Sequence, residues 1–183
     1  MDILAELGCF RIWIGSESGS QRILDAMERG VTPEQVRTAV ALAKSRGIKA
    51  GMFLMWGYEG EELEDIEATV EHVKRSNPDV FFTTVSYPIK GTPYFDDVSP
   101  RLVSLKSWAE ASDRDYRIRG RHSRRFYQYT DQLLRSEVEL DRLLKDSTKD
   151  NGAGASSAPI GELEKKVNEA REGLRTSFTE SEA

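Results

Sequence analysis

The sequence has few of the residues that form cross-links or bind metals. Its 183 residues include one cysteine, Cys9, and two histidines, His72 and His122. A single cysteine excludes an intramolecular disulfide and fits a reducing compartment, so we expect a cytoplasmic protein. Neither histidine has a ligand-like spacing to a cysteine or a carboxylate, so we expect both at the surface, and the sequence predicts no metal-binding residues.

The sequence also lacks long apolar runs and an excess of positive charge. No run approaches the roughly 20 apolar residues that span a bilayer, and the N-terminus has no basic region followed by an apolar core, so we expect no membrane partner. The net charge is −5 at pH 7. An acidic chain is poorly suited to general polyanion binding, so nucleic acid is not an expected partner.

Three apolar runs are each followed by a turn rich in glycine, carboxylate or proline. The runs are Phe10–Ile14, Gly51–Trp56 and Val80–Tyr87, and the turns are residues 15–20 (Gly-Ser-Glu-Ser-Gly-Ser), 57–61 (Gly-Tyr-Glu-Gly-Glu) and 88–93 (Pro-Ile-Lys-Gly-Thr-Pro). In parallel α/β folds, ligands bind where the carboxyl ends of the strands meet. The three turns therefore predict one side of a ligand-binding mouth.

Helical patterns separate these runs. Thr32-Pro33-Glu34-Gln35 is a capping box with proline in the first turn, and Gly47 sits where a left-handed C-terminal residue belongs. A second amphipathic pattern runs from Leu63 to Val73. Strands that alternate with helices in this way predict a parallel α/β architecture.

The C-terminal half has a different pattern. Residues 99–145 have helical propensity, and several apolar side chains there are available for packing: Leu102, Leu105, Trp108, Phe126, Tyr129, Leu133, Leu134, Val138 and Leu140. Residues 146–161 have the composition of a flexible linker. We expect 146–183 to be this linker followed by a weak terminal helix, largely disordered.

The three strand–turn motifs resemble the radical S-adenosylmethionine (radical SAM) superfamily, in particular its cobalamin-binding-domain and methylthiotransferase-like branch. Residues 13–30 resemble its fourth βα unit, residues 50–61 its fifth strand and turn, and residues 87–94 its sixth. The resemblance covers roughly residues 7–98. It implies that residues 1–98 are the C-terminal half of a partial parallel (βα)6 TIM-like barrel, with three βα units, followed by the helical extension.

The resemblance also implies an S-adenosylmethionine site. Its candidate cofactor-binding residues in this sequence are Glu17, Ser18, Arg29, Met55, Gly57 and Tyr87. The resemblance gives Glu17 the ribose hydroxyls and Arg29 the methionine carboxylate, for which a guanidinium fork is well suited. Simpler roles are also open to these residues: Ser18 as a helix cap with Glu17 as a surface charge, Arg29 as a solvated arginine near a helix C-terminus, and Met55 as a core residue. Turn chemistry alone also accounts for the glycine and prolines that follow Tyr87. Tyr58 and Glu59 replace the Leu-Pro that is common in the family's fifth turn, which leaves the shape of that loop open.

One required motif is missing. The superfamily holds a 4Fe-4S cluster with Cys-x3-Cys-x2-Cys, and this chain has only Cys9. We therefore expect no catalytic residues and no radical chemistry in this chain alone. Either it is the C-terminal half of a longer enzyme, whose N-terminal half is on the same chain or a separate polypeptide, or it is a truncated, non-catalytic scaffold. Cobalamin is implied only by an N-terminal domain of such a parent.

Two further expectations concern surfaces. The strand at Arg11 to Ile14 would lack one neighbour, and an open apolar edge favours self-association. Residues 114–129 carry arginines among aromatic side chains, and we expect this segment to pack beside the barrel and bound the substrate side, with nucleic-acid binding a weaker alternative. A third reading is an unrelated phosphate- or nucleotide-binding α/β domain, against which the absence of a Gly-x-Gly-x-x-Gly or Walker pattern counts.

Overall fold

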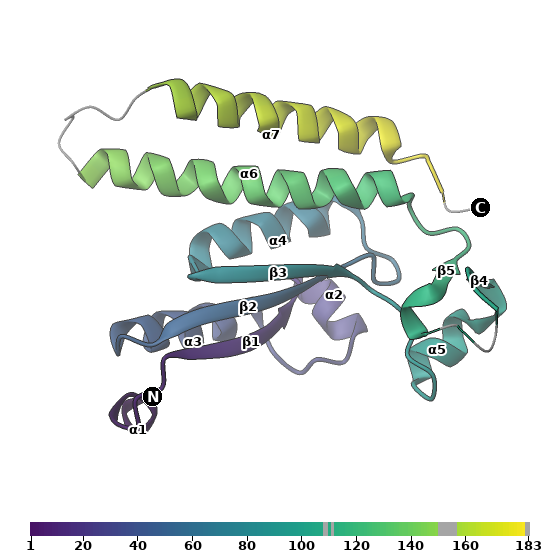
Figure 1. Cartoon of the computed structure of the whole chain (residues 1–183), viewed down its shortest axis with the longest axis horizontal. Coiled ribbons are helices and arrows are strands. Elements are labelled where there is room, and N and C mark those ends of the chain that lie inside the picture. The colour runs from purple at the N-terminus through teal and green to yellow at the C-terminus, as the bar shows by residue number, and fades with distance from the viewer. Residues whose placement is uncertain (108–109, 111, 150–156, 182–183) are drawn as a thin grey trace.

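The computed structural model describes residues 1–107, 110, 112–149 and 157–181. After a short helix, α1 (Asp2–Glu6), three strands form a parallel sheet in the order β1-β2-β3 (Figure 1). These are β1 (Arg11–Glu17), β2 (Lys49–Trp56) and β3 (Val80–Val85). The three apolar runs of the sequence therefore form the sheet, and the α/β class is confirmed.

Local sequence features set the helix boundaries in this half. The helices are α2 (Gln21–Ala26), α3 (Pro33–Ser45) and α4 (Leu63–Ser76). At the start of α3 the Gln35 N–H donates to Thr32 Oγ1 (3.2 Å) and the Thr32 N–H donates to Gln35 Oε1 (2.8 Å), so the capping box is confirmed. Asn77 ends α4 in the left-handed conformation.

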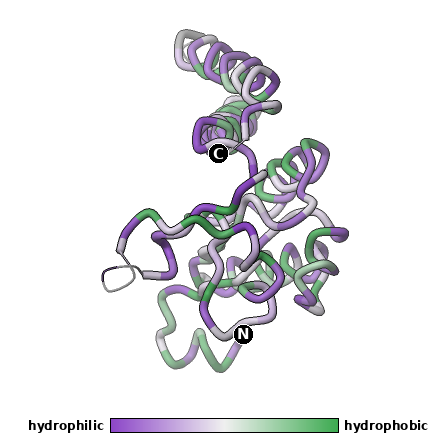
Figure 2. The backbone as a smooth tube through the Cα atoms, turned by 90° about the vertical axis from the view of Figure 1, so that its right-hand side faces the viewer, coloured by the Kyte–Doolittle hydropathy of each residue, from purple (hydrophilic) through white to green (hydrophobic). Residues whose placement is uncertain are grey.

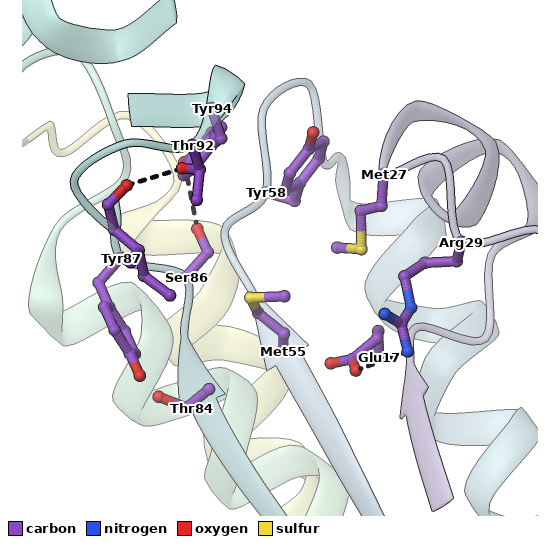
Figure 3. Close-up of a pocket in the computed structure, with 11 residues that line it drawn as sticks. Glu17, Met27, Arg29, Met55, Tyr58, Thr84, Ser86, Tyr87, Thr92 and Tyr94 are labelled. Atoms are coloured by element: carbon purple, nitrogen blue, oxygen red, sulfur yellow. Dashed lines mark hydrogen bonds and ion pairs between the residues drawn. The ribbon is translucent and has the colours of Figure 1, made fainter. Parts of the chain in front are cut away.

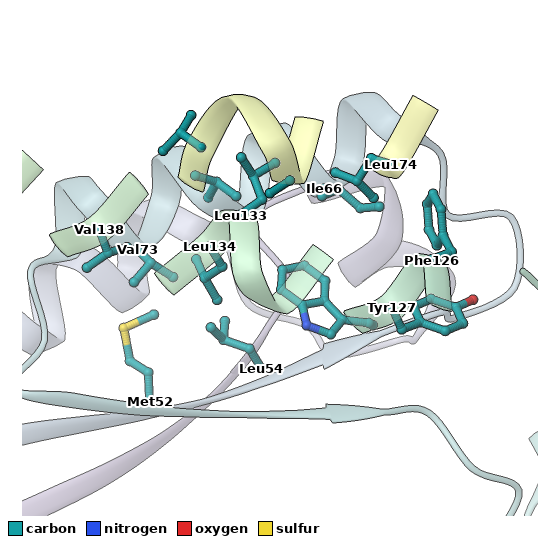
Figure 4. Close-up of a cluster of buried hydrophobic side chains, with 14 of the residues drawn as sticks. Met52, Leu54, Ile66, Val73, Phe126, Tyr127, Leu133, Leu134, Val138 and Leu174 are labelled. Carbon is teal, nitrogen blue, oxygen red and sulfur yellow. The ribbon is translucent and has the colours of Figure 1, made fainter. Parts of the chain in front are cut away.

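One face of the sheet forms the hydrophobic core. Alternate residues of β2 point into it and are buried: Ala50, Met52, Leu54 and Trp56. They pack against buried side chains of α3, α4 and the later helix α6 (Arg124–Lys149), as Figure 4 shows for Met52, Leu54, Val73 and Leu134. The period of two along β2 therefore places its other side chains on the opposite face.

The opposite face carries three stacked aromatic rings. Trp13 lies 4.9 Å from Phe53 and 5.4 Å from Phe82 between ring centroids, and each ring is about half exposed. Gly51 makes this stack possible, because a Cβ there would come within 2.4 Å of the Trp13 indole. Among the described residues, β1 pairs only with β2, so its other edge is open.

Residues 99–145, expected to be helical, fold differently in their first part. After α5 (Pro93–Val98) come two 3-10 turns, Ser99–Arg101 and Asp113–Asp115, and two short antiparallel strands, β4 (Leu102–Ser104) and β5 (Tyr116–Ile118). Only the part within α6 is helical as expected. Pro100 cannot donate a helical backbone hydrogen bond, and both short strands contain a β-branched residue. These two features explain why this part of the chain is not helical. Trp108 lies outside the described residues.

The C-terminal segment also differs from the expected disordered tail. Helix α7 (Ser157–Ser177) lies antiparallel over α6 (Figure 1), and both helices mix hydrophilic and hydrophobic residues (Figure 2). Its buried apolar side chains, Leu163, Val167, Ala170 and Leu174, recur at a spacing of four and three. This narrow stripe is enough for a two-helix seam, because it faces α6 throughout. None of the described helices is long and apolar enough to cross a membrane.

Two glycines of α7 provide a test of this seam. Gly161 has open space where a Cβ would be, whereas a Cβ on Gly173 would lie 2.4 Å from the Tyr129 ring. We predict that Gly161→Ala raises the free energy of unfolding by about 0.5–1 kcal/mol through helix propensity. Gly173→Ala should lower it by about 1–3 kcal/mol, because the ring must move. Denaturant titration measures both, and changes of the same sign would contradict the packing of α7 on α6.

Candidate functional site

Three serines fix the end of β1 and the turn after it to helix α4. Ser16 Oγ lies 2.9 Å from His72 Nε2, Ser18 Oγ lies 3.1 Å from Thr69 Oγ1, and Ser20 Oγ donates to Asp65 Oδ1 at 2.6 Å. All six residues are buried. Their partners recur every three or four residues on α4, so they share one helix face. We call these three contacts the serine ladder.

The environment of each partner suits its role. Arg37 Nη1 lies 3.3 Å from His72 Nδ1, and a guanidinium only donates, so the His72 proton sits on Nε2 and is donated to Ser16. Burial, with the nearby Arg37 and Arg75 charges, lowers the pKa of His72 to about 4, so it is neutral. Burial tends to raise the pKa of Asp65, but hydrogen bonds led by that of Ser20 outweigh it and leave this pKa lowered.

Gly19 allows the turn to approach α4 closely. A Cβ on Gly19 would lie 2.4 Å from the Ala68 carbonyl oxygen, and the Gly19 N–H donates to Thr69 Oγ1 at 2.9 Å. Any side chain at this position would force the turn away from the helix. The second glycine of the motif is therefore required for packing.

Glu17 lies between the serines and faces the other way. The pairing register of β1 with β2 shifts between Gly15 and Glu17, and Glu17 has a φ of +57°. This bulge and left-handed backbone re-aim the side chain, as bulges near binding sites often do. Its carboxylate Oε1 lies 3.3 Å from Arg29 Nη2. The serine ladder thus holds the backbone while Glu17 points to the end of the sheet.

Glu17 and Arg29 line a cleft of about 400 Å³ (Figure 3). Its wall is mainly apolar and aromatic: Met27, Met55, Tyr58, Thr84, Ser86, Tyr87, Ile89, Thr92 and Tyr94. The Tyr58 and Tyr94 rings stack with centroids 5.1 Å apart. A cleft of this size, with many apolar groups and a few directed polar groups, suits a small organic ligand.

The two charged groups are available for a ligand with matching polar groups. Burial raises the pKa of Glu17, and the charge of Arg29 partly opposes this. A carboxylate accepts hydrogen bonds from two neighbouring hydroxyls, and an exposed guanidinium can pair with a carboxylate. The donor set and the cleft therefore fit a ligand such as S-adenosylmethionine, which has a planar base, a diol and a carboxylate.

The structure brings four of the six candidate cofactor-binding residues to this cleft: Glu17, Arg29, Met55 and Tyr87. Ser18 does not line it, since its hydroxyl is buried against Thr69. Gly57 does not line it either. Gly57 has a φ of +71°, and a Cβ there would lie 2.5 Å from the Tyr127 hydroxyl. Its structural role is to let helix α6 pack closely.

Gly57 also holds a buried carboxyl group. Its N–H donates to Glu61 Oε2 at 2.6 Å, and Glu61 Oε1 has no partner among the described residues. Burial raises the pKa of Glu61 to about 7, although the Gly57 N–H opposes the shift. Glu61 is thus a structural group beneath the turn that follows β2.

Sequence reasoning missed two kinds of residue. Met27, Tyr58 and Tyr94 line the cleft but come from turns whose mutual position depends on the fold. Tyr58 occupies a position where the family pattern has a different residue. This departure was the sequence feature that could have indicated its place in the cleft. His72, expected on the surface, is buried, and the alternation of serines in residues 16–20 was the indication of a buried polar partner.

The residues present do not fit an iron–sulfur cluster. The chain has one cysteine, and no group of three potential metal-binding side chains occurs in the part of the chain that the structure describes. Three thiolates are needed to hold such a cluster with one iron open. The one cysteine of this chain therefore cannot hold such a cluster.

Comparison with known proteins gives a consistent result. Residues 1–73 match the family model of the radical SAM superfamily. An uncharacterized methyltransferase of Pyrococcus horikoshii is 31% identical over 65% of this chain and 26% of the relative. A tRNA-2-methylthio-N(6)-dimethylallyladenosine synthase of Thiobacillus denitrificans is 38% identical over 52% of this chain and 24% of the relative. The chain thus spans about a quarter of the length of these relatives.

One solved structure is also similar. The archaeal Elp3 of Methanocaldococcus infernus, with an N-terminal deletion, is 24% identical and has a TM-score of 0.49. The match covers 54% of this chain and 24% of that one.

Glu61 and His72 give stability opposite dependences on pH. The pKa of Glu61 is about 7 when folded and 4.5 ordinarily, so its contribution is present below pH 4.5 and is lost as pH rises through 7. The pKa of His72 is about 4 when folded and 6.5 ordinarily, so its contribution is present above pH 6.5 and is lost as pH falls through 4. Between pH 4.5 and 6.5 the two effects oppose each other.

We predict that Glu61→Gln exposes the His72 effect. The variant's free energy of unfolding should rise from pH 4 to 6.5. Its difference from the wild type should change by about 3 kcal/mol between pH 4.5 and 7.5. Denaturant titration at several pH values measures this, with the exposed Glu64→Gln as the matched control. A Glu61→Gln profile parallel to that of the wild type would show that Glu61 is not buried as described.

Proposed function

We propose, from the match of residues 1–73 to the radical SAM family model, that this chain is the S-adenosylmethionine-binding part of a radical SAM enzyme. The observation that carries the proposal is the cleft where Glu17, Arg29, Met55 and Tyr87 converge. The motifs of three successive strand–turn segments predict these four residues. The first and the last, Glu17 and Tyr87, are 70 positions apart in the sequence.

Each end of the cofactor has a matching group in the cleft. Glu17 would accept hydrogen bonds from the ribose hydroxyls, and Arg29 would pair with the methionine carboxylate. The Met55 thioether and the stacked Tyr58 and Tyr94 rings offer an apolar wall for the adenine. Glu17 and Arg29 pair with each other at 3.3 Å, so ligand binding would exchange one ion pair for two directed contacts.

The cluster would have to come from elsewhere in a complete enzyme. There it would supply the electron that cleaves S-adenosylmethionine to a 5′-deoxyadenosyl radical, while this chain would bind and orient the nucleoside and methionine ends. The open edge of β1 supports this arrangement, because further βα units would continue the sheet there. The exposed Trp13–Phe53–Phe82 stack would then face the interior of a partial (βα)6 barrel.

The relatives support a shared cofactor more than a shared substrate. One is named as a methyltransferase and another as a tRNA methylthio synthase, and a further one, of Rubrivivax gelatinosus, as an anaerobic magnesium-protoporphyrin IX monomethyl ester cyclase. The substrates in these names differ. We therefore extend to this chain only the S-adenosylmethionine site.

A second candidate is a non-catalytic binding or scaffold fragment. The single cysteine favours it, because these residues cannot hold a cluster. The open edge of β1 also favours association, either with a second copy or with a separate N-terminal half. Binding of S-adenosylmethionine by the isolated chain separates a retained cofactor site from a scaffold that has lost it.

Two ligands separate the roles of the charged residues. We predict that Glu17→Gln weakens binding of both S-adenosylmethionine and 5′-methylthioadenosine about tenfold or more, because both have the ribose diol. Arg29→Gln should weaken the binding of S-adenosylmethionine by a similar factor. It should leave the affinity for 5′-methylthioadenosine unchanged, because this ligand lacks the methionine carboxylate. Calorimetric titration of the wild type and the two variants with each ligand measures the six affinities.

The exposed Glu28→Gln is the matched control, since Glu28 adjoins the cleft without lining it. It should bind both ligands like the wild type. Failure of the wild type to bind either ligand at millimolar concentration would contradict a retained site and favour the scaffold. Equal losses for both ligands in Arg29→Gln would contradict the assigned orientation.

A further inference from the structure

A second cavity, distinct in character from the cofactor cleft, lies on the other side of the strand end of β3. It has a volume of about 300 Å³ and is formed by the end of β3, the β4–β5 hairpin and the start of α6. Four arginines line it: Arg114, Arg117, Arg121 and Arg124. No aspartate or glutamate is among its described lining residues. We call it the arginine pocket.

Two of the arginines are already held in place. Arg121 donates to the Ser86 carbonyl oxygen (2.6 Å), to Ser86 Oγ (2.8 Å) and to the Tyr94 hydroxyl (2.8 Å). Arg114 lies over the Tyr87 ring, with its guanidinium carbon 5.0 Å from the ring centroid. These contacts fix two positive charges in the wall without neutralising them.

The other two have no acidic partner. In the part of the chain that the structure describes, neither Arg117 nor Arg124 takes part in an ion pair or a hydrogen bond through its side chain. Nearby arginines do form ion pairs: Arg125 pairs with Glu180, and Arg135 pairs with Asp131. Four cations gathered without an acid in a chain of net charge −5 repel one another, and a bound anion relieves that repulsion.

The arginine pocket shares a wall with the cofactor cleft. Thr84, Ser86 and Tyr87 line both cavities. A molecule held in the arginine pocket therefore lies one residue thickness from the place proposed for S-adenosylmethionine. Tyr87 and Tyr116 present aromatic rings on the pocket side, which suits an unsaturated or cyclic group next to the anion.

We infer that the arginine pocket binds a small organic phosphate, with its phosphate on Arg117 and Arg124 and its organic part against Tyr87 and Tyr116. That this phosphate ester is the substrate of the complete enzyme rests on the proposed function; the binding itself does not. A dianionic phosphate matches several guanidinium forks at once, whereas a single carboxylate matches only one.

The surroundings favour a small molecule over a nucleic acid. The four arginines line one concave site, and acidic residues interrupt the basic segment of the sequence, among them Asp113, Asp115 and Asp131. Nucleic-acid binding needs phosphate contacts spread along a strand, and their number sets its salt dependence. The pocket has room for one phosphate group and a ring.

The test uses phenyl phosphate as the probe and the full 183-residue chain. We expect calorimetric or NMR titration to show saturable binding, with benzoate bound more weakly. The double variant Arg117→Gln/Arg124→Gln should lose about tenfold or more in affinity. The matched control is the double variant Arg119→Gln/Arg101→Gln, which removes the same charge outside the pocket and should bind like the wild type.

Equal losses in the two double variants would overturn the inference, because they would show only a general effect of net charge. Tighter binding of a single-stranded oligonucleotide than of phenyl phosphate would also overturn the inference in favour of a nucleic-acid surface. The oligonucleotide affinity would then fall with salt concentration with a log–log slope that corresponds to the release of several counterions. Glu17→Gln should leave phenyl phosphate binding unchanged. If phenyl phosphate binds and S-adenosylmethionine does not, the pocket stands and the proposed function fails.

Discussion

The serine ladder is the interaction on which the site depends. Three buried serines, one at the end of β1 and two in the turn after it, bond to three side chains on one face of α4, and Gly19 lets the backbone touch that helix. Buried polar contacts of this kind are costly unless every partner is present, so they specify a single position for the turn. Because the serines alternate, the residue between them, Glu17, is directed to the opposite side. The structural and ligand-facing residues of this motif are therefore interleaved.

One face of the sheet and the carboxyl end of its strands have separate roles. The face covered by α3, α4 and α6 supplies the core, and the end of the sheet supplies two cavities of opposite character that share the end of β3. One combines a carboxylate, an arginine and apolar walls, and the other concentrates unpaired positive charge. Helix α6 connects both cavities to the core. Its residue Tyr127 packs against Gly57, and its first residue, Arg124, lines the arginine pocket. A cofactor and a second ligand could thus be held side by side by one rigid framework.

The sequence predicts the features whose causes are local. The capping box at Thr32 and the apolar runs of the strands are determined within a few residues, and the structure has them as predicted. Features set by distant partners were not predictable in this way. Ser18 reads equally as a ligand contact or a cap, and its bond to Thr69 depends on how α4 packs. His72 and the stripe of α7 likewise acquire their roles only from a facing element, Ser16 in one case and α6 in the other.

The central claim is that the serine ladder positions Glu17 without touching the ligand, and Thr69→Val tests it most directly. Valine keeps the shape of Thr69 and removes the hydroxyl that bonds to Ser18 and Gly19. Ser76→Ala is the control, because its buried hydroxyl on the same helix has no partner among the described residues. The affinity for 5′-methylthioadenosine should fall about tenfold in Thr69→Val and stay unchanged in Ser76→Ala. Wild-type affinity in a folded Thr69→Val variant would contradict the account.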